Sequence, residues 1–287
     1  MTHTLWNTPA TQERLRLQPW ALPQPGPAWP TNPSRLDSLL RGFDPISLAD
    51  MNAVALLNRT DTKFVMPTGQ LLHTLAALQS DYRVLCMRGQ RLHHYRTLYF
   101  DTPDFALYHL HVNKRPNLYK VRSREYTDTH ESFLEVKHKT HKERTIKERI
   151  PTAQPMVELT TESVDWLNGV YPYDCQVLEP KLWNTFTRIT LVSRHCCERV
   201  TLDVELAFYA DHQQVQMDHL AIAELKADAC SPASPFLAQM RTQRIRPIGF
   251  SKYCIGTSLL FDQVKKNALK PKMLRLEKMM KGSTCND

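Results

Sequence analysis

Glycine is scarce in this chain, which has only eight glycines among 287 residues. The sequence contains neither the GxxxxGK[ST] loop nor the GxGxxG pattern, in which glycines let backbone N–H groups approach a phosphate. It also lacks GxSxG, the turn that presents a nucleophilic serine in many hydrolases. These absences exclude the common glycine-built nucleotide sites, so any phosphate chemistry must rest on side chains.

Long apolar runs and paired cysteines are missing as well. No apolar run approaches the roughly 20 residues of a membrane helix, and the N-terminus lacks the basic and apolar segments of a signal peptide. The seven cysteines show no CxxC spacing, the pattern typical of zinc and redox sites, and we interpret them as reduced thiols. The sequence therefore predicts a cytoplasmic protein without a membrane span.

Positive charge is in excess. Lys and Arg number 37 against 29 Asp and Glu, which gives a formal net charge of +8 and a pI near 9.1. An excess of this size predicts an anionic partner. Nucleic acid, a phosphate-rich small molecule and an anionic membrane surface all meet that condition, and composition does not choose among them.

Proline marks off the beginning of the chain. Residues 1–45 are proline-rich and lack periodicity, so we interpret them as an extended or loosely ordered arm. Residues 46–262 show the pattern of a globular domain, and residues 263–287 form a basic tail that is either a terminal helix or a frayed end. Strands are predicted at Arg59–Met66, Tyr82–Cys86, His93–Asp101, Asn117–Tyr126, Ser132–Thr140, Arg144–Ile150, Phe186–Ser193, Cys197–Phe208 and Ala221–Lys226. Helices are predicted at Ser47–Leu57, Thr68–Leu78, Asp104–His111, Glu162–Leu167, Pro232–Arg241 and Ser251–Phe261. Consecutive strands joined by short turns indicate a mainly β fold, an antiparallel barrel or large sheet with peripheral helices.

Charged side chains alternate with apolar ones along several of these strands. Successive strand residues point to opposite faces, so Lys120, Arg122 and Arg124 share one face. Further sets share a face in the same way: Glu135 with Lys137 and Lys139, Arg199 with Asp203 and Glu205, and Glu224 with Lys226. One such strand is explained by a sheet with a solvated face. Across six strands the density of cations predicts an anion between them, because neighbouring cations otherwise repel.

A linear phosphate chain fits this lining. Arg binds two phosphate oxygens at once and Lys supplies a mobile point charge. A triphosphate or longer chain repeats its anionic oxygens along a line, which suits several strands better than a single pocket. The carboxylates among the cations predict a Mn²⁺ or Mg²⁺ cofactor, since these ions prefer oxygen ligands and bridge phosphates. Phosphoryl transfer would then rest on positioning and charge neutralisation.

Three runs, Tyr95–Thr102, Lys120–Tyr126 and Phe133–Lys139, together resemble the VTC polyphosphate-polymerase domain of the triphosphate tunnel (CYTH-like) superfamily. Later blocks follow in the same order: Arg188, Arg199–Asp203, Ala223–Lys226 and Phe250–Tyr253. The resemblance covers roughly residues 59–260. It implies a closed eight-stranded antiparallel β-barrel whose interior holds the phosphate chain, and a stand-alone protein of bacterial type.

The resemblance also implies roles for individual residues. The catalytic set is Lys63, Arg122, Arg124, Lys137, Lys147, Arg188, Arg199, Lys226 and Lys252. The substrate-binding set is the same without Lys226 and with the addition of Glu135, Lys139 and Ser251. Glu224 is the implied metal ligand. The wider superfamily opens with ExExK, whereas this chain has Arg59-Thr60-Asp61-Thr62-Lys63 and so lacks the first glutamate, a usual metal ligand.

The implied activity is a polyphosphate polymerase that uses ATP as donor and inorganic polyphosphate or pyrophosphate as acceptor. Two alternatives stay open on the residues alone. The first is a triphosphatase that uses the same site with water as acceptor, and the second is a non-catalytic module that binds polyanions. Nucleic acid is not expected as a partner, because the interspersed carboxylates would repel its backbone.

Overall fold

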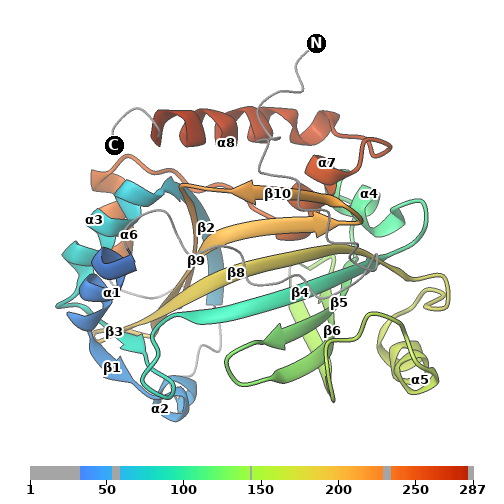
Figure 1. Cartoon of the computed structure of the whole chain (residues 1–287), viewed down its shortest axis with the longest axis horizontal. Helices are drawn as coiled ribbons and strands as arrows, with labels where there is room; N and C mark the ends of the chain where they lie inside the picture. The colour runs from blue at the N-terminus through green and yellow to red at the C-terminus, as the bar shows by residue number, and fades with distance from the viewer. Residues whose placement is uncertain (1–32, 54–58, 143, 229–233, 284–287) are drawn as a thin grey trace.

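One large β-sheet forms the centre of the molecule (Figure 1). The computed structural model describes residues 33–53, 59–142, 144–228 and 234–283. Eight strands follow one another across the sheet in the order β2 (Arg59–Pro67), β11 (Leu220–Asp228), β9 (Glu198–Ala210), β8 (Glu179–Ser193), β4 (His93–Asp101), β5 (Leu118–Tyr126), β6 (Glu131–Lys139) and β7 (Thr145–Thr152), all paired antiparallel. Three short strands join at the side: β1 (Asp44–Ile46), β3 (Tyr82–Leu85) and β10 (Gln213–Met217). The prediction of a mainly antiparallel β fold with peripheral helices is confirmed.

The predicted closure of the barrel is wrong. Strands β2 and β7 are the two ends of the path, and no backbone pairing joins them in the described residues. The edge of β2 is occupied instead by a later segment, since the backbone N–H of Ile248 donates to the carbonyl of Lys63 at 2.8 Å. Strand β7 is exposed along most of its length and carries three consecutive charged residues, which disfavour edge-to-edge pairing.

The sheet nevertheless curls, so that its two ends face each other. The pKa of Lys137 on β6 is lowered by burial and next by the charge of Lys63, which belongs to β2 at the opposite end of the path. Two strands so distant in the sheet influence each other's charges only if the sheet bends back. We call the side that this curvature encloses the inner face.

Helices cover the outer face and bury its apolar side chains. Helices α1 (Pro33–Arg41), α3 (Thr68–Leu78) and α6 (Pro235–Thr242) lie on one side of the sheet (Figure 1) and share a core with β2, β11, β9 and β8. Helix α5 (Thr161–Val170) packs on the outer face of β5 and β6. The short helix α2 (Leu48–Ala53) contributes Met51 to a small cluster with β1 and β3. Burial of these apolar faces accounts for the alternation of apolar and polar residues along the strands.

The inner face is divided between an apolar part and a charged part. Helices α4 (Ala106–Val112), α7 (Lys252–Leu260) and α8 (Lys270–Ser283), with the short η1 (Asn267–Leu269), cover the apolar part, which includes Val65, Ile222 and Phe186. The remaining inner-face residues are mostly charged. The basic C-terminal segment thus contains a packed helix over 270–283, with Leu276 fully buried, which is the first of the two alternatives considered for it.

Most element boundaries agree with the sequence predictions to within one or two residues. Ser47 caps α2 as predicted, because its Oγ accepts from the N–H of Asp50 at 3.1 Å. Strand β8 begins seven residues earlier than predicted, at Glu179, a stretch in which Pro180 and Asn184 hide the strand pattern. Strands β1 and β10 were not predicted, and α1 lies inside the segment predicted to be an arm. The rest of that arm, residues 1–32, lies outside the described residues.

Two further sequence expectations concern membranes and cysteines. None of the helices in the described ranges is long and apolar enough to cross a membrane. Cys86, Cys175, Cys196, Cys197 and Cys254 are free thiols, as expected. Cys230 and Cys285 lie outside the described residues.

Candidate functional site

Glu135 is the centre of the first charged cluster on the inner face. Its side chain is fully buried, and it accepts from Arg122 Nε at 2.8 Å and Nη2 at 2.7 Å. Lys147 Nζ lies 2.5 Å from its other oxygen, and Arg124 Nε lies 4.0 Å away. Burial alone would raise the pKa of Glu135, but the three cations outweigh it and hold that pKa well below its usual range. This carboxylate is therefore ionised and covered by its partners.

Asp203 is the centre of the second cluster. Arg188 donates to both of its oxygens, from Nε at 2.6 Å and from Nη2 at 2.8 Å, and Lys252 from the start of α7 donates to it as well. Burial opposes ionisation of Asp203, but Arg188 and Lys252 hold its pKa below the usual range. The ring of Tyr95 lies between the clusters, 5.1 Å from the Arg188 guanidinium carbon and 5.8 Å from that of Arg124, so the two groups of cations adjoin.

Glu224 forms a looser third cluster. Its Oε1 lies 3.8 Å from Lys63 Nζ and 3.4 Å from Lys226 Nζ, and each of these lysines also has another partner. Lys63 donates to the carbonyl of Phe250 at 3.3 Å, and Lys226 to Asp61 at 3.3 Å. Burial would raise the pKa of Glu224, but Lys63 and Lys226 lead the charges that lower it to about 2. This carboxylate keeps about a fifth of its surface accessible, whereas Glu135 keeps none.

Lys137 is an inner-face cation that lacks a partner among the described residues. It makes no hydrogen bond or ion pair with any described residue, although it lies between Lys63, Arg122 and Lys120. Burial and these three charges lower its pKa to about 7. The pKa of Lys252 and of Lys147 falls to about 8, in each case through burial that the neighbouring carboxylate only partly offsets. An anion placed among these groups would relieve this repulsion.

The remaining predicted residues lie around these clusters. Arg199 is opposite Lys226 in the β9–β11 register, and Lys139 is at the end of β6. Ser251 has a structural role, since its Oγ accepts from the N–H of Cys254 at 3.3 Å and caps α7 beside Lys252. The structure thus gathers the basic residues that the sequence predicted on one face, and it shows Glu135 as a buried ion-pair centre.

Glu224 is the one residue that the sequence predicts as a ligand for Mn²⁺ or Mg²⁺. The described residues include no group of three or more His, Cys, Asp or Glu side chains able to hold a metal ion. Glu135 and Asp203 are each occupied by two or more cations. A single accessible carboxylate fits a Mg²⁺-like ion, which typically takes one or two protein carboxylates and completes its shell with water and phosphate oxygens.

Sequence reasoning missed three contributors to the charged part of the inner face. Lys120 shares a face of β5 with Arg122, and the alternation of the strand assigns it no role of its own. His111 on α4 donates from Nε2 to the carbonyl of Tyr119 at 2.9 Å, so its Nδ1 is free to accept from Lys120 Nζ at 3.3 Å. Lys272 lies on α8, and no local sequence pattern predicts where that helix packs. The alternation of Lys120 with Arg122 was the one available signal.

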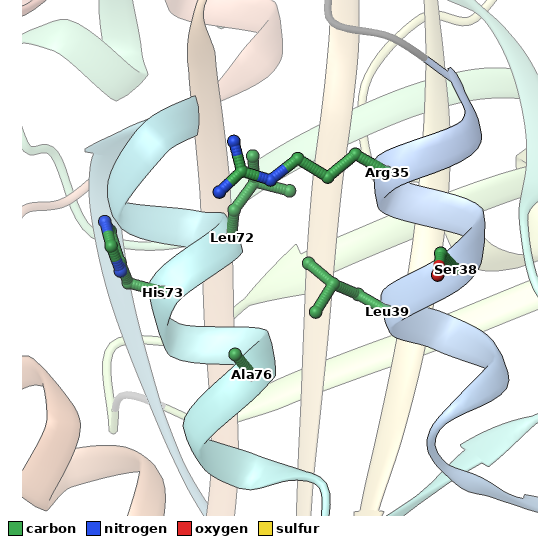
Figure 2. Close-up of a pocket in the computed structure, with 6 residues that line it drawn as sticks. All are labelled: Arg35, Ser38, Leu39, Leu72, His73 and Ala76. Atoms are coloured by element: carbon green, nitrogen blue, oxygen red, sulfur yellow. The ribbon is translucent and has the colours of Figure 1, made fainter.

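A hollow of about 340 Å³ lies elsewhere, between α1 and α3 on the outer side of the sheet (Figure 2). It is lined by Arg35, Ser38, Leu39, Leu72, His73 and Ala76. Helices α1 and α3 pack on the opposite face of the sheet from Glu135, Asp203 and Glu224. The charged clusters and this hollow are therefore separate features.

Comparison with known proteins identifies a family. A model of the VTC domain matches residues 58–261. Among solved structures, the chain is similar to a putative adenylate cyclase from Vibrio parahaemolyticus, at 13% identity and a TM-score of 0.39, over 69% of this chain and 97% of that one. It is similar to a putative adenylyl cyclase from Hippeastrum, described as having a dominant triphosphatase activity, at 14% identity and a TM-score of 0.43, over 69% and 94%. A putative adenylate cyclase from Bacillus halodurans gives 13% identity and a TM-score of 0.43, over 68% and 94%. No match was found among curated proteins.

Proposed function

Because the chain belongs to the VTC domain family, we propose that it is a polyphosphate polymerase, which transfers the terminal phosphoryl group of ATP to a growing inorganic polyphosphate chain. The observation that carries this proposal is the surplus of buried cations on the inner face. Lys137 has no partner among the described residues, and the pKa values of Lys120, Lys137 and Lys252 are lowered by burial and by other cations. A bound polyanion would remove that cost.

The reaction needs little from the protein beyond charge and position. The bond between the terminal phosphorus of ATP and its bridging oxygen breaks, a new bond forms to a terminal oxygen of the acceptor chain, and ADP leaves. The acceptor oxygen is already ionised, so no general base is required. The inner-face carboxylates suit this chemistry, because Glu135, Asp203 and Glu224 all have lowered pKa values and are weak bases.

Arginines and lysines would divide the binding. Arg122, Arg124 and Arg188 present planar groups that bind two oxygens at once. Lys63, Lys137 and Lys252 would follow the charge as it moves from donor to acceptor. A Mn²⁺ or Mg²⁺ ion, when bound, would neutralise phosphate charge, and Glu224 is the residue that would hold it.

The test is an assay of purified protein with ATP and either Mn²⁺ or Mg²⁺, with product length resolved on a gel. Chains of many phosphates are expected. Free phosphate without chains would show that polymerisation is wrong and that a triphosphatase uses the site. Chain binding without any turnover would leave the binding module as the function.

A matched pair of variants makes the assay specific to the inner face. Arg122→Ala removes a cation from the Glu135 cluster and is expected to abolish most chain synthesis. Lys278→Ala removes the same charge from an exposed position on α8 and is expected to leave synthesis unchanged. Equal activity in the two variants would contradict the assignment of the inner face.

A further inference from the structure

Asp101 is a fully buried carboxylate at the end of β4, and it belongs to none of the three charged clusters. Its Oδ1 accepts from the backbone N–H of Thr102 at 2.7 Å and from that of Leu107 at 2.8 Å. Its Oδ2 accepts from the N–H of Tyr108 at 2.9 Å and from the hydroxyl of Tyr253. One side chain therefore joins three elements, which are β4, the first turn of α4 and the first turn of α7.

The bond from Tyr253 connects this carboxylate to the proposed active site. Tyr253 follows Lys252 directly at the start of α7, a helix that lies beside α4 (Figure 1). The ammonium of Lys252 donates to Asp203, whereas the hydroxyl of Tyr253 donates to Asp101. Successive residues of a helix are separated by about 100° around its axis. Two bonds in such different directions fix the rotation of the first turn as well as its position.

Close packing holds α7 one turn further along. A Cβ at Gly256 would lie 2.5 Å from Cδ1 of Phe208 and 2.7 Å from Cδ2 of Leu182, so the helix backbone rests directly on β9 and β8 at this point. With α7 held at Gly256, the end that carries Lys252 can still tilt or turn. The hydroxyl bond of Tyr253 is placed to prevent that movement.

The position of Lys252 matters because its ammonium group lies in a crowded place. Arg188 donates to both oxygens of the same carboxylate, Asp203, and the ring centroid of Phe186 lies 4.1 Å from the Lys252 nitrogen. A lysine side chain is a point charge on a flexible stem, so its own geometry does not fix where the charge lies. A misplacement of about 1 Å in a catalytic group can cost on the order of a hundredfold in rate. The backbone that carries Lys252 therefore has to be held precisely.

We propose that Asp101, acting through the hydroxyl of Tyr253, is a positioning residue that holds Lys252 where it can neutralise phosphate charge. The inference rests on the proposed function for the identity of the substrate. Neither Asp101 nor Tyr253 is assigned a contact with that substrate. Their contribution should therefore disappear when Lys252 itself is removed, which a purely structural role would not predict.

The experiment is a double-mutant cycle between Tyr253→Phe and Lys252→Ala. Affinity for tripolyphosphate is measured by isothermal titration calorimetry, and the rate of chain synthesis is measured on the same preparations. Tyr253→Phe removes one hydroxyl and keeps the ring. It should weaken tripolyphosphate binding about fivefold and slow synthesis about tenfold when Lys252 is present. In the Lys252→Ala background both effects should shrink to less than about twofold.

The matched control is Tyr108→Phe, which removes a hydroxyl from the neighbouring ring. That hydroxyl donates to the carbonyl of Lys265 at 3.0 Å, away from Lys252. The control should change neither affinity nor synthesis by more than about twofold. Equal losses in Tyr253→Phe and Tyr108→Phe would overturn the proposal. It would also be overturned if Tyr253→Phe had no effect, or had the same effect with and without Lys252.

Asp101→Asn tests the carboxylate itself. The amide cannot accept at both ends, so this variant also loosens the first turn of α4 and is expected to be less stable. Its loss of affinity per folded molecule should equal that of Tyr253→Phe, and the two changes together should add nothing further. A larger loss in the combined variant would mean that Asp101 does not act through Tyr253. If Asp101→Asn does not fold, the cycle with Tyr253→Phe decides the proposal.

These outcomes are separable from those of the polymerase assay. A protein that makes no chains, but loses tripolyphosphate affinity through Tyr253 only when Lys252 is present, would lose the proposed polymerase function and keep this inference. A protein whose chain synthesis is unchanged by Tyr253→Phe would keep the function and lose the inference. Thermal unfolding of every variant gives the folded fraction to which affinities and rates are referred.

Discussion

Glu135 and Glu224 lie on the same inner face and have opposite surroundings. Glu135 is fully buried, with Arg122 and Lys147 at 2.5–2.8 Å and Arg124 at 4.0 Å. Glu224 has its lysines at 3.4–3.8 Å and stays partly accessible. Both carboxylates are ionised, since cations lower the pKa of each. The two differ in how accessible their carboxylate oxygens are. A ligand or metal can approach the oxygens of Glu224, whereas those of Glu135 are buried against the cations that they bind.

This contrast separates two ways in which a carboxylate serves a basic site. Around Glu135, the negative charge allows Arg122 and Arg124 to be buried side by side, which without it would be strongly unfavourable. Around Glu224, the same charge balances Lys63 and Lys226 and still leaves oxygen lone pairs exposed. The first arrangement is structural, whereas the proposed function gives the second a chemical role, and substitutions at the two positions should separate them.

The largest effect is expected for Glu135→Gln, in the free energy of unfolding. The amide removes the charge that compensates Arg122 and Lys147, so stability should fall by about 3–5 kcal/mol. Denaturant titration measures this change. Asp37→Asn is the control, because Asp37 pairs with Arg41 on the exposed surface of α1 and should cost less than about 0.5 kcal/mol. Similar losses in the two variants would mean that Glu135 is not an organising charge.

Glu224→Gln is expected to act on turnover instead. Chain synthesis should fall by about a hundredfold, a loss typical for one group that stabilises charge in the transition state. The free energy of unfolding should change by less than about 1 kcal/mol. Lys63 would still donate to the carbonyl of Phe250, and Lys226 would still donate to Asp61. Steady-state kinetics and thermal unfolding on the same preparation test this pair of expectations. A large loss of stability with normal turnover per folded molecule would reverse the comparison.

A smaller effect is expected from the titration of Lys137, which lies between the two carboxylates. Its pKa of about 7 makes it charged below neutral pH and neutral above it. A bound polyanion would raise that pKa, because a nearby negative charge favours the ammonium form. Affinity for tripolyphosphate should therefore fall as pH rises from about 6 to 9, by up to about tenfold, with proton uptake on binding near neutrality. Isothermal titration calorimetry in buffers of different ionisation enthalpy measures the uptake.

Lys137→Arg isolates this residue from the titration of the phosphates themselves. The guanidinium stays charged over the whole range, so the variant should show a flatter pH profile and less proton uptake. Identical profiles for the two proteins would exclude Lys137 as the titrating group. The same residue also makes the free energy of unfolding depend on pH. In the unfolded chain Lys137 keeps its proton up to about pH 10.4, whereas in the folded protein it loses the proton near pH 7. The contribution of Lys137 therefore makes the free energy of unfolding rise with pH from about 7 to 10.

The smallest expected effect belongs to Ser251, which caps α7 next to Lys252. Ser251→Ala should destabilise the protein by about 1 kcal/mol through loss of the cap. Ser251→Asp restores an acceptor for the N–H of Cys254 and should recover most of that loss. Thermal unfolding of the three proteins distinguishes these cases, and an aspartate variant no more stable than the alanine variant would show that the cap is not what Ser251 contributes.

The local features of this structure could be predicted from the sequence. Alternation placed Lys120, Arg122 and Arg124 on one face of β5, because the two-residue period of a strand is set by its own backbone. The matching strand boundaries, such as those of β4, follow from the same rule. Helix α3 was also found correctly, since Pro67 and Thr68 mark its start.

The features that could not be predicted from the sequence depend on contacts between distant segments. The bond of Lys252 to Asp203 joins α7 to β9, and no local pattern specifies it. The closed barrel was implied by resemblance and failed, because closure depends on how β2 and β7 meet and on the segment around Ile248. The packing of α8 beside β2 likewise depends on an apolar surface that several strands build together.

The bond between Ile248 and Lys63 also sets the order in which the molecule can be completed. Lys63 and Phe250, which are joined by a second bond, lie 187 residues apart. When β2 leaves the ribosome, most of the chain has still to be synthesised before the segment around Ile248 can pair with the edge of that strand. Contacts of such long sequence separation form late and slowly. During synthesis, this edge of β2 therefore stays uncovered until the segment around Ile248 has been made, and an uncovered strand edge can pair with other chains.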